Sequence, residues 1–130
     1  TQLTLQAWFG EPEIAWLRRQ DHALAHYLVP IIERFIDDVY AQYLKDRGFF
    51  NWDVATAIYL TNPQIFESRD YRIALSLDNL KSGLIPEDRD RSAQASKVVD
   101  LPERLLSLTQ FNRILLEKLD VIAAMMGGAS

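Results

Sequence analysis

Three neighbouring residues, Asn51-Trp52-Asp53, place an amide, an indole and a carboxylate between a glycine turn and an apolar run. An aspartate at this position can accept hydrogen bonds from the free N–H groups in the first turn of a helix. The same carboxylate is a hard oxygen ligand for a cation, and the indole beside it can stack on a flat ring. The periodicity of the sequence alone favours a helix-capping role for Asp53. The choice between this role and ligand binding therefore depends on the surrounding sequence.

Two histidines, His22 and His26, are four residues apart on a predicted helix. This spacing places two imidazoles on one face, as in zinc sites. The metalloprotease form of the motif has Glu directly after the first histidine, where this chain has Ala23, and no third ligand lies nearby in the sequence. We therefore interpret the pair as residues of a surface helix.

The acidic groups are weaker candidates. Glu87, Asp88 and Asp90 are interleaved with two arginines that largely neutralise them, which is typical of a solvated loop. The carboxylates of Asp37 and Asp38 point about 100° apart around a helix, so at most one can face a given site. No Gly-x-Ser-x-Gly nucleophile motif and no glycine-rich phosphate loop occurs, so the sequence identifies no catalytic residue.

Composition restricts the class of protein. The 130 residues are 48% hydrophobic, which suits one unit spanning residues 1–130 with a sizeable core. A net charge of −4 without a basic block indicates neither a nucleic-acid nor a membrane partner. The absence of cysteine excludes disulfides and thiolate chemistry and favours a cytoplasmic protein. Because the chain opens on Thr1, we expect further sequence upstream.

The elements that must position these residues follow from periodicity. Alternation over Gln2–Ala7 predicts a strand, and Glu11-Pro12 predicts the start of a helix. A second helix, capped by Asp21, carries an apolar stripe that Pro30 should kink or divide, and Gly48 should end this helical region. The stripe consists of Leu24, Leu28, Ile31, Phe35, Val39 and Tyr43.

The second half of the chain mixes helices and strands. A helix should begin near Asp53 and stop before Asn62-Pro63, because a residue that precedes proline avoids the helical conformation. The remaining expected elements are strands over Tyr71–Leu77 and Ala95–Val99, a loop over Lys81–Asp90, a closing helix from Leu101-Pro102-Glu103 to Leu119, and a frayed tail over Met125–Ser130. The sum is a mixed α/β unit rich in helix.

The order of these features resembles the C-terminal signature of nucleoside hydrolases, the inosine-uridine or purine-preferring N-ribohydrolase family. In that signature an aromatic residue or His precedes Asp, then a helix of small residues ends near Asn/Asp-Pro and a Phe. The matching stretches are Phe50–Leu60, Asn62–Phe66, the strand Tyr71–Leu77, the turn Lys81-Ser82-Gly83, Val98-Val99-Asp100 and the helical pair Glu11–Leu44.

This resemblance implies an α/β fold with an open, mostly parallel sheet and flanking helices, of which this chain is the C-terminal portion. It implies cleavage of the N-glycosidic bond of ribonucleosides by a calcium-activated water, in an enzyme that is a homo-oligomer when complete. Asp53 matches a calcium ligand, and Trp52 matches a base-pocket residue that stacks on purines. Asn51 would lie at the edge of the nucleoside pocket.

One departure from the family is large. The aspartate-rich N-terminal loop that supplies most calcium ligands and the general base does not occur in these residues. Asp53 alone cannot satisfy a calcium ion that needs about six to eight oxygen ligands. We therefore expect the missing N-terminal part of the same enzyme to complete the site. Two alternatives stay open: a non-catalytic interaction module whose apolar stripe packs on a partner, and a degenerate relative that binds nucleosides without hydrolysing them.

Overall fold

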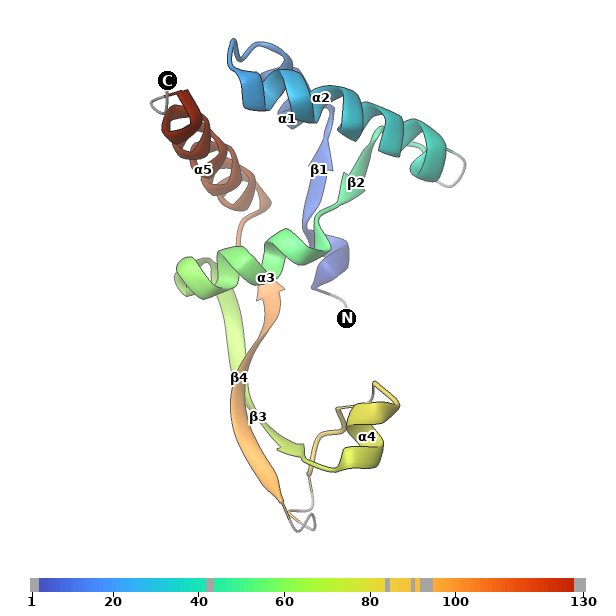
Figure 1. The fold of residues 1–130 in the computed structure, drawn as a ribbon. Coiled ribbons are helices and arrows are strands. Elements are labelled where there is room, and N and C mark those ends of the chain that lie inside the picture. The colour runs from blue at the N-terminus through green and yellow to red at the C-terminus, as the bar shows by residue number, and fades with distance from the viewer. Residues whose placement is uncertain (1–2, 42–43, 84, 90, 92–94, 128–130) are drawn as a thin grey trace.

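A computed structural model describes residues 3–41, 44–83, 85–89, 91 and 95–127 (Figure 1). The chain is a mixed α/β unit, as the sequence predicts, and its strands form two separate two-stranded antiparallel sheets. The helices are α1 (Glu11–Arg18), α2 (Ala23–Phe35), α3 (Trp52–Thr61), α4 (Leu77–Lys81) and α5 (Leu108–Gly127). The strands are β1 (Trp8–Gly10), β2 (Gly48–Phe50), β3 (Phe66–Ala74) and β4 (Ser96–Leu105).

The elements are arranged around α3, which crosses the middle of the molecule. Helices α1, α2 and α5 lie on one side of α3, together with the β1–β2 sheet (Figure 1). On the other side the long β3–β4 ribbon projects away and carries α4 near its far end (Figure 1). Residues close to both ends of the chain therefore share one half of the fold.

Helices α1 and α2 begin at different kinds of caps. The Glu13 carboxylate accepts a hydrogen bond of 2.9 Å from the Gly10 N–H at the start of α1. The cap of α2 is His22, whose Nδ1 accepts from the Ala25 N–H at 3.0 Å, so the prediction that Asp21 caps this helix is wrong. Pro30 lies inside α2 without dividing it, and a short π-helical turn, η2 (Ile36–Tyr40), continues the helix.

The small sheet is built around two glycines. Its register pairs Trp8 with Phe50 and Gly10 with Gly48. A Cβ on Gly48 would lie only 2.5 Å from the Phe9 carbonyl oxygen, and a Cβ on Gly10 would lie 2.6 Å from Trp8 Nε1. Gly48 is therefore a strand residue whose missing side chain leaves room for the Trp8 indole, and its predicted role in ending the preceding helix is wrong.

The predicted strand over Gln2–Ala7 is also wrong for the part that the structure describes. Residues Thr4–Gln6 form a 3₁₀ turn, η1, closed by a hydrogen bond of 2.9 Å from the Gln6 N–H to the Leu3 carbonyl. Leu3 and Ala7 are buried, whereas Leu5 is exposed, so the buried residues are four apart rather than two. Gln2 lies outside the described residues.

The helix α3 follows the prediction closely, because it ends at Thr61 before Asn62-Pro63. A 3₁₀ turn, η3 (Pro63–Ile65), then leads into β3, which begins five residues before the predicted strand at Tyr71 and ends at Ala74. Leu77, the last residue of that predicted strand, instead begins α4.

The closing helix begins later than its sequence indicates. Leu101 and Pro102 continue β4, where Pro102 pairs with Ser68 beside a register shift between Glu67 and Ser68. Proline lacks an N–H, but an edge strand at an irregular pairing tolerates that loss. The helix α5 starts only after Ser107, whose Oγ accepts from the Gln110 N–H at 3.2 Å.

The predicted frayed tail is likewise wrong as far as Gly127, because α5 continues to that residue. The last part of that tail, residues 128–130, lies outside the described residues.

The core consists of two hydrophobic clusters joined by α5. The first lies between α3, the base of the ribbon and α5, and includes Ala7, Ile58 and Phe111. The second lies under α1 and α2 and includes Phe9 and Ile14. Leu115 of α5 packs against both clusters. Ala7 and Phe9, the sequence neighbours of Trp8, lie in the first and the second cluster respectively.

We predict that Gly48→Ala destabilises the fold, because the added methyl group must displace the Phe9 backbone and the Trp8 indole. The free energy of unfolding should fall by about 1–3 kcal/mol, the usual cost of overpacking, in a denaturant titration. Gly127→Ala is the matched control, since a Cβ there has no atom within 4 Å. Equal stability of Gly48→Ala and the wild type would contradict the packing described for this sheet.

Candidate functional site

The Asn51-Trp52-Asp53 residues lie where β2 passes directly into α3. The Asn51 N–H donates to the Ala7 carbonyl at 2.8 Å, and the Asn51 carbonyl accepts from the Ala55 N–H at 3.2 Å. Asn51 is thus the N-cap residue of α3, with backbone bonds on both sides but no capping bond from its side chain. Its backbone fixes the point at which the next two side chains leave the helix.

The capping interpretation of Asp53 is wrong. Asp53 lies in the first turn, one residue inside the helix, where its negative charge is favourable to the positive end of the helix dipole. Within the part of the chain that the structure describes, its carboxylate makes no hydrogen bond or ion pair. The carboxylate therefore stays available to a ligand.

Trp52 is also turned outward. Its side chain is 54% exposed, whereas Ala55 and Ile58 form the buried face of the same helix. An uncovered indole leaves a large apolar surface in contact with water, which is unfavourable. Trp52 and Asp53 thus place an exposed aromatic ring and an unpaired carboxylate in the first turn of α3, about 100° apart around the helix axis.

The other acidic and histidine candidates have local partners. His26 lies 3.6 Å from Asp21, and His22 Nε2 lies 3.8 Å from Asp120. The Glu87 carboxylate accepts from Arg89 at 2.8 Å, and Asp90 lies outside the described residues. Among the described residues, no three His, Cys, Asp or Glu side chains come together in a way that could hold a metal ion.

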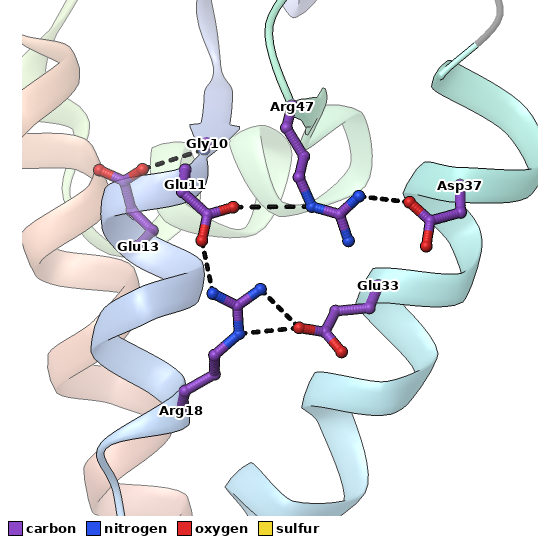
Figure 2. Close-up of polar contacts among 7 residues, drawn as sticks. All are labelled: Gly10, Glu11, Glu13, Arg18, Glu33, Asp37 and Arg47. Carbon is purple, nitrogen blue, oxygen red and sulfur yellow. Dashed lines mark hydrogen bonds and ion pairs between the residues drawn. The ribbon is translucent and has the colours of Figure 1, made fainter.

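A network of charged side chains connects the elements that precede the site in the chain (Figure 2). Arg18 of α1 donates to Glu11 at 2.5 Å and to Glu33 of α2 at 2.8 Å. Arg47, which directly precedes β2, lies 3.6 Å from Glu11 and donates to Asp37. These contacts join α1, η2 and the start of the strand that delivers Asn51 to α3.

The network perturbs its cations in the expected direction. Hydrogen bonds to Glu33 and then Glu11 raise the pKa of Arg18, and the hydrogen bond to Asp37 raises the pKa of Arg47. Both guanidiniums therefore stay charged over the physiological range. The sequence did not indicate this network, because its partners are up to 36 residues apart and no local motif links them.

The far half of α3 is attached to the ribbon. The Tyr59 hydroxyl donates to the Asp100 carboxylate of β4. This hydrogen bond raises the pKa of the Tyr59 phenol, because ionisation would remove the shared proton and place two negative charges together. The Tyr59 ring also packs edge-on against Phe66 at a centroid distance of 5.3 Å, so α3 is held at both ends.

No protein-family model matches the chain, and no curated protein matches it either. Among the described residues, no helix is both long enough and apolar enough to cross a membrane.

We predict that Trp52 is the most accessible of the three tryptophans, since Trp8 and Trp16 are partly buried. Acrylamide quenching should show one readily quenched fraction of the emission, and Trp52→Phe should remove it. Trp16→Phe, the matched change, should leave that fraction in place. Loss of the quenchable fraction in Trp16→Phe instead would contradict the outward position of Trp52.

Proposed function

We propose that this chain is the C-terminal part of a calcium-dependent nucleoside hydrolase that cleaves the N-glycosidic bond of purine ribonucleosides. The observation that carries the proposal is the exposed indole of Trp52 beside the unpaired carboxylate of Asp53, at the start of α3. About half of Trp52 is open to solvent, and among the described residues the Asp53 carboxylate makes no hydrogen bond or ion pair. Their types suit a flat base and a hard cation respectively.

Asp53 fits the calcium centre as one ligand among several. A carboxylate oxygen is the donor that Ca²⁺ prefers, and a free carboxylate in a first helical turn can turn toward an ion. The remaining ligands and the base that activates water would come from the longer protein. The bound ion would lower the pKa of the attacking water, while this chain supplies a ligand and a stacking surface.

Trp52 would hold the purine. Stacking on an indole orients a base without requiring a specific hydrogen-bond pattern, which suits an enzyme that accepts more than one purine. Asn51 would lie at the pocket edge, where its amide can donate to or accept from the nucleoside. Its backbone bonds to Ala7 and Ala55 would keep that edge in place.

In this proposal the open, mostly parallel sheet would be formed by the longer protein. The described strands of this chain pair only as β1–β2 and β3–β4, both antiparallel, so they would lie outside that sheet. A sequence upstream of Thr1 with an Asp-x-Asp-x-Gly-x-Asp-Asp-like loop after a strand would support the enzyme. A sequence without such a loop would favour a non-catalytic role.

One observation favours an interaction module as the second candidate. Part of the predicted apolar stripe is exposed, since Ile31, Phe35 and Val39 are each more than 40% exposed along α2 and η2, as is Tyr27 of α2. Tyr43, the last residue of that stripe, lies outside the described residues. Exposed apolar rows of this kind mark surfaces that bind other protein segments.

We predict that Asp53→Ala abolishes calcium-dependent release of free purine base by the longer protein, because the ion loses a ligand that no neighbouring group replaces. Base release is followed at saturating calcium and again across a calcium titration. Asp21→Ala, which removes an exposed carboxylate from another part of the chain, should keep full activity. The isolated 130-residue chain should release no base, and release by that chain would contradict the proposed division of the site.

Trp52→Ala should weaken the binding of a purine nucleoside to the longer protein by about 1–3 kcal/mol, the scale of one base–aromatic stack. Leu60→Ala is the control, since Leu60 is an exposed apolar residue at the other end of the same helix. Binding is measured by calorimetry with a non-hydrolysable purine analogue. Unchanged affinity in Trp52→Ala would remove the stacking role.

A further inference from the structure

A groove of about 680 Å³ lies between α1 and α5, away from Trp52 and Asp53. Two half-buried indoles line it, Trp8 at its β1 end and Trp16 on α1, opposite Leu108 and Leu116 of α5. An indole ring carries negative electrostatic potential over its face, and two of the three tryptophans of the chain line this one groove. The groove plays no part in the proposed hydrolase site.

The aromatic wall is held in place from two directions. Gly10 and Gly48 lie close against the Trp8 indole, because a Cβ on either residue would collide with that ring. Asn112 of α5 is only 4% exposed, and its Nδ2 donates to the Trp8 carbonyl oxygen at 3.0 Å. This bond connects the two walls of the groove directly, so the groove exists before any ligand arrives.

The charges around the groove are mostly negative. Glu13, Glu117 and Asp120 line it with a single cation, Arg113. Arg113 lies 3.6 Å from Glu117 in a mostly exposed pair, which leaves the other two carboxylates without a cationic neighbour in the lining. His22 lies 3.8 Å from Asp120 and would add positive charge only when protonated. A cation in the groove is therefore attracted, and an anion is repelled.

We propose that this groove binds a small organic ammonium ion. Indole is the aromatic ring that attracts cations most strongly, and quaternary ammonium groups are typically recognised by aromatic side chains that surround them. The carboxylates of Glu117 and Asp120 would add long-range attraction at the exposed rim. A neutral apolar ligand would gain the same contact area but neither electrostatic term.

Comparing choline with its neutral isostere 3,3-dimethylbutan-1-ol distinguishes a site for an ammonium ion from a site for a neutral apolar ligand. The indole N–H signals of the three tryptophans are followed by ¹H–¹⁵N NMR while each compound is added to the chain. With choline, the Trp8 and Trp16 signals should shift and saturate, and the exposed Trp52 signal should stay in place. The neutral isostere should bind about tenfold more weakly, as expected when the cation–π attraction is lost.

A pair of charge variants tests the rim. The double variant Glu117→Gln and Asp120→Asn should weaken choline binding several-fold and reduce its dependence on salt. Asp21→Asn is the control for loss of surface charge, because it removes a fully exposed carboxylate that does not line the groove. The ¹H–¹⁵N spectrum of each variant without ligand should match that of the wild type, which shows that the fold around the groove is retained.

Three results would overturn the proposal. Equal binding of the neutral isostere would show an apolar pocket, and a parallel shift of Trp52 would show non-specific contact of choline with any indole. Absence of a saturable shift at Trp8 and Trp16 would show that no site exists. The outcome is independent of nucleoside hydrolysis, because neither Trp52 nor Asp53 lies in the groove.

Discussion

The close approach of β1 and β2 is the constraint on which the rest of the fold depends. Gly10 and Gly48 face each other in this pairing, and their missing side chains leave the space that the Trp8 indole occupies. On either side of Trp8, Ala7 and Phe9 anchor the chain in the two hydrophobic clusters. The Asn51 N–H then bonds to the Ala7 carbonyl, so the same pairing sets where α3 begins. A change in its register would displace the groove and the candidate site together.

Charged contacts orient elements that hydrophobic burial alone would leave free to slide. Arg18 and Arg47 connect α1, α2 and η2 at the surface (Figure 2). Exposed pairs of this kind contribute little stability individually, so their main effect is on geometry. Along the ribbon, Arg104 of β4 pairs with Glu67 of β3 at 2.5 Å, and Arg69 of β3 lies 3.4 Å from Glu103 of β4. These cross-strand contacts support a sheet that has only two strands and little core of its own.

Sequence patterns predicted the elements that depend on interactions between residues close together in the chain. The helix α3 was predictable because its apolar run meets an Asn62-Pro63 stop, and the mixed α/β class followed from the same periodicity. The strand predicted at Gln2–Ala7 failed because tertiary packing buries Leu3 and Ala7, four residues apart. The early start predicted for α5 failed because Pro102 fits an irregular edge of β4 as well as it fits a helix start. The Arg18 and Arg47 network joins residues that are distant in the sequence, and no single-sequence pattern reports such contacts.

For the candidate site, the residue types were visible in the sequence, but the free state of the Asp53 carboxylate was visible only in the structure.

We propose above all that the start of α3 presents Asp53 to a metal ion and Trp52 to a base. The most direct test is a crystal structure of the longer protein with Ca²⁺ and a non-hydrolysable purine nucleoside. We expect an Asp53 carboxylate oxygen at about 2.3–2.6 Å from the ion, the usual range for calcium ligands, and the purine stacked on the Trp52 indole. A calcium ion whose ligands are complete without Asp53, or a base held away from Trp52, would contradict the proposal.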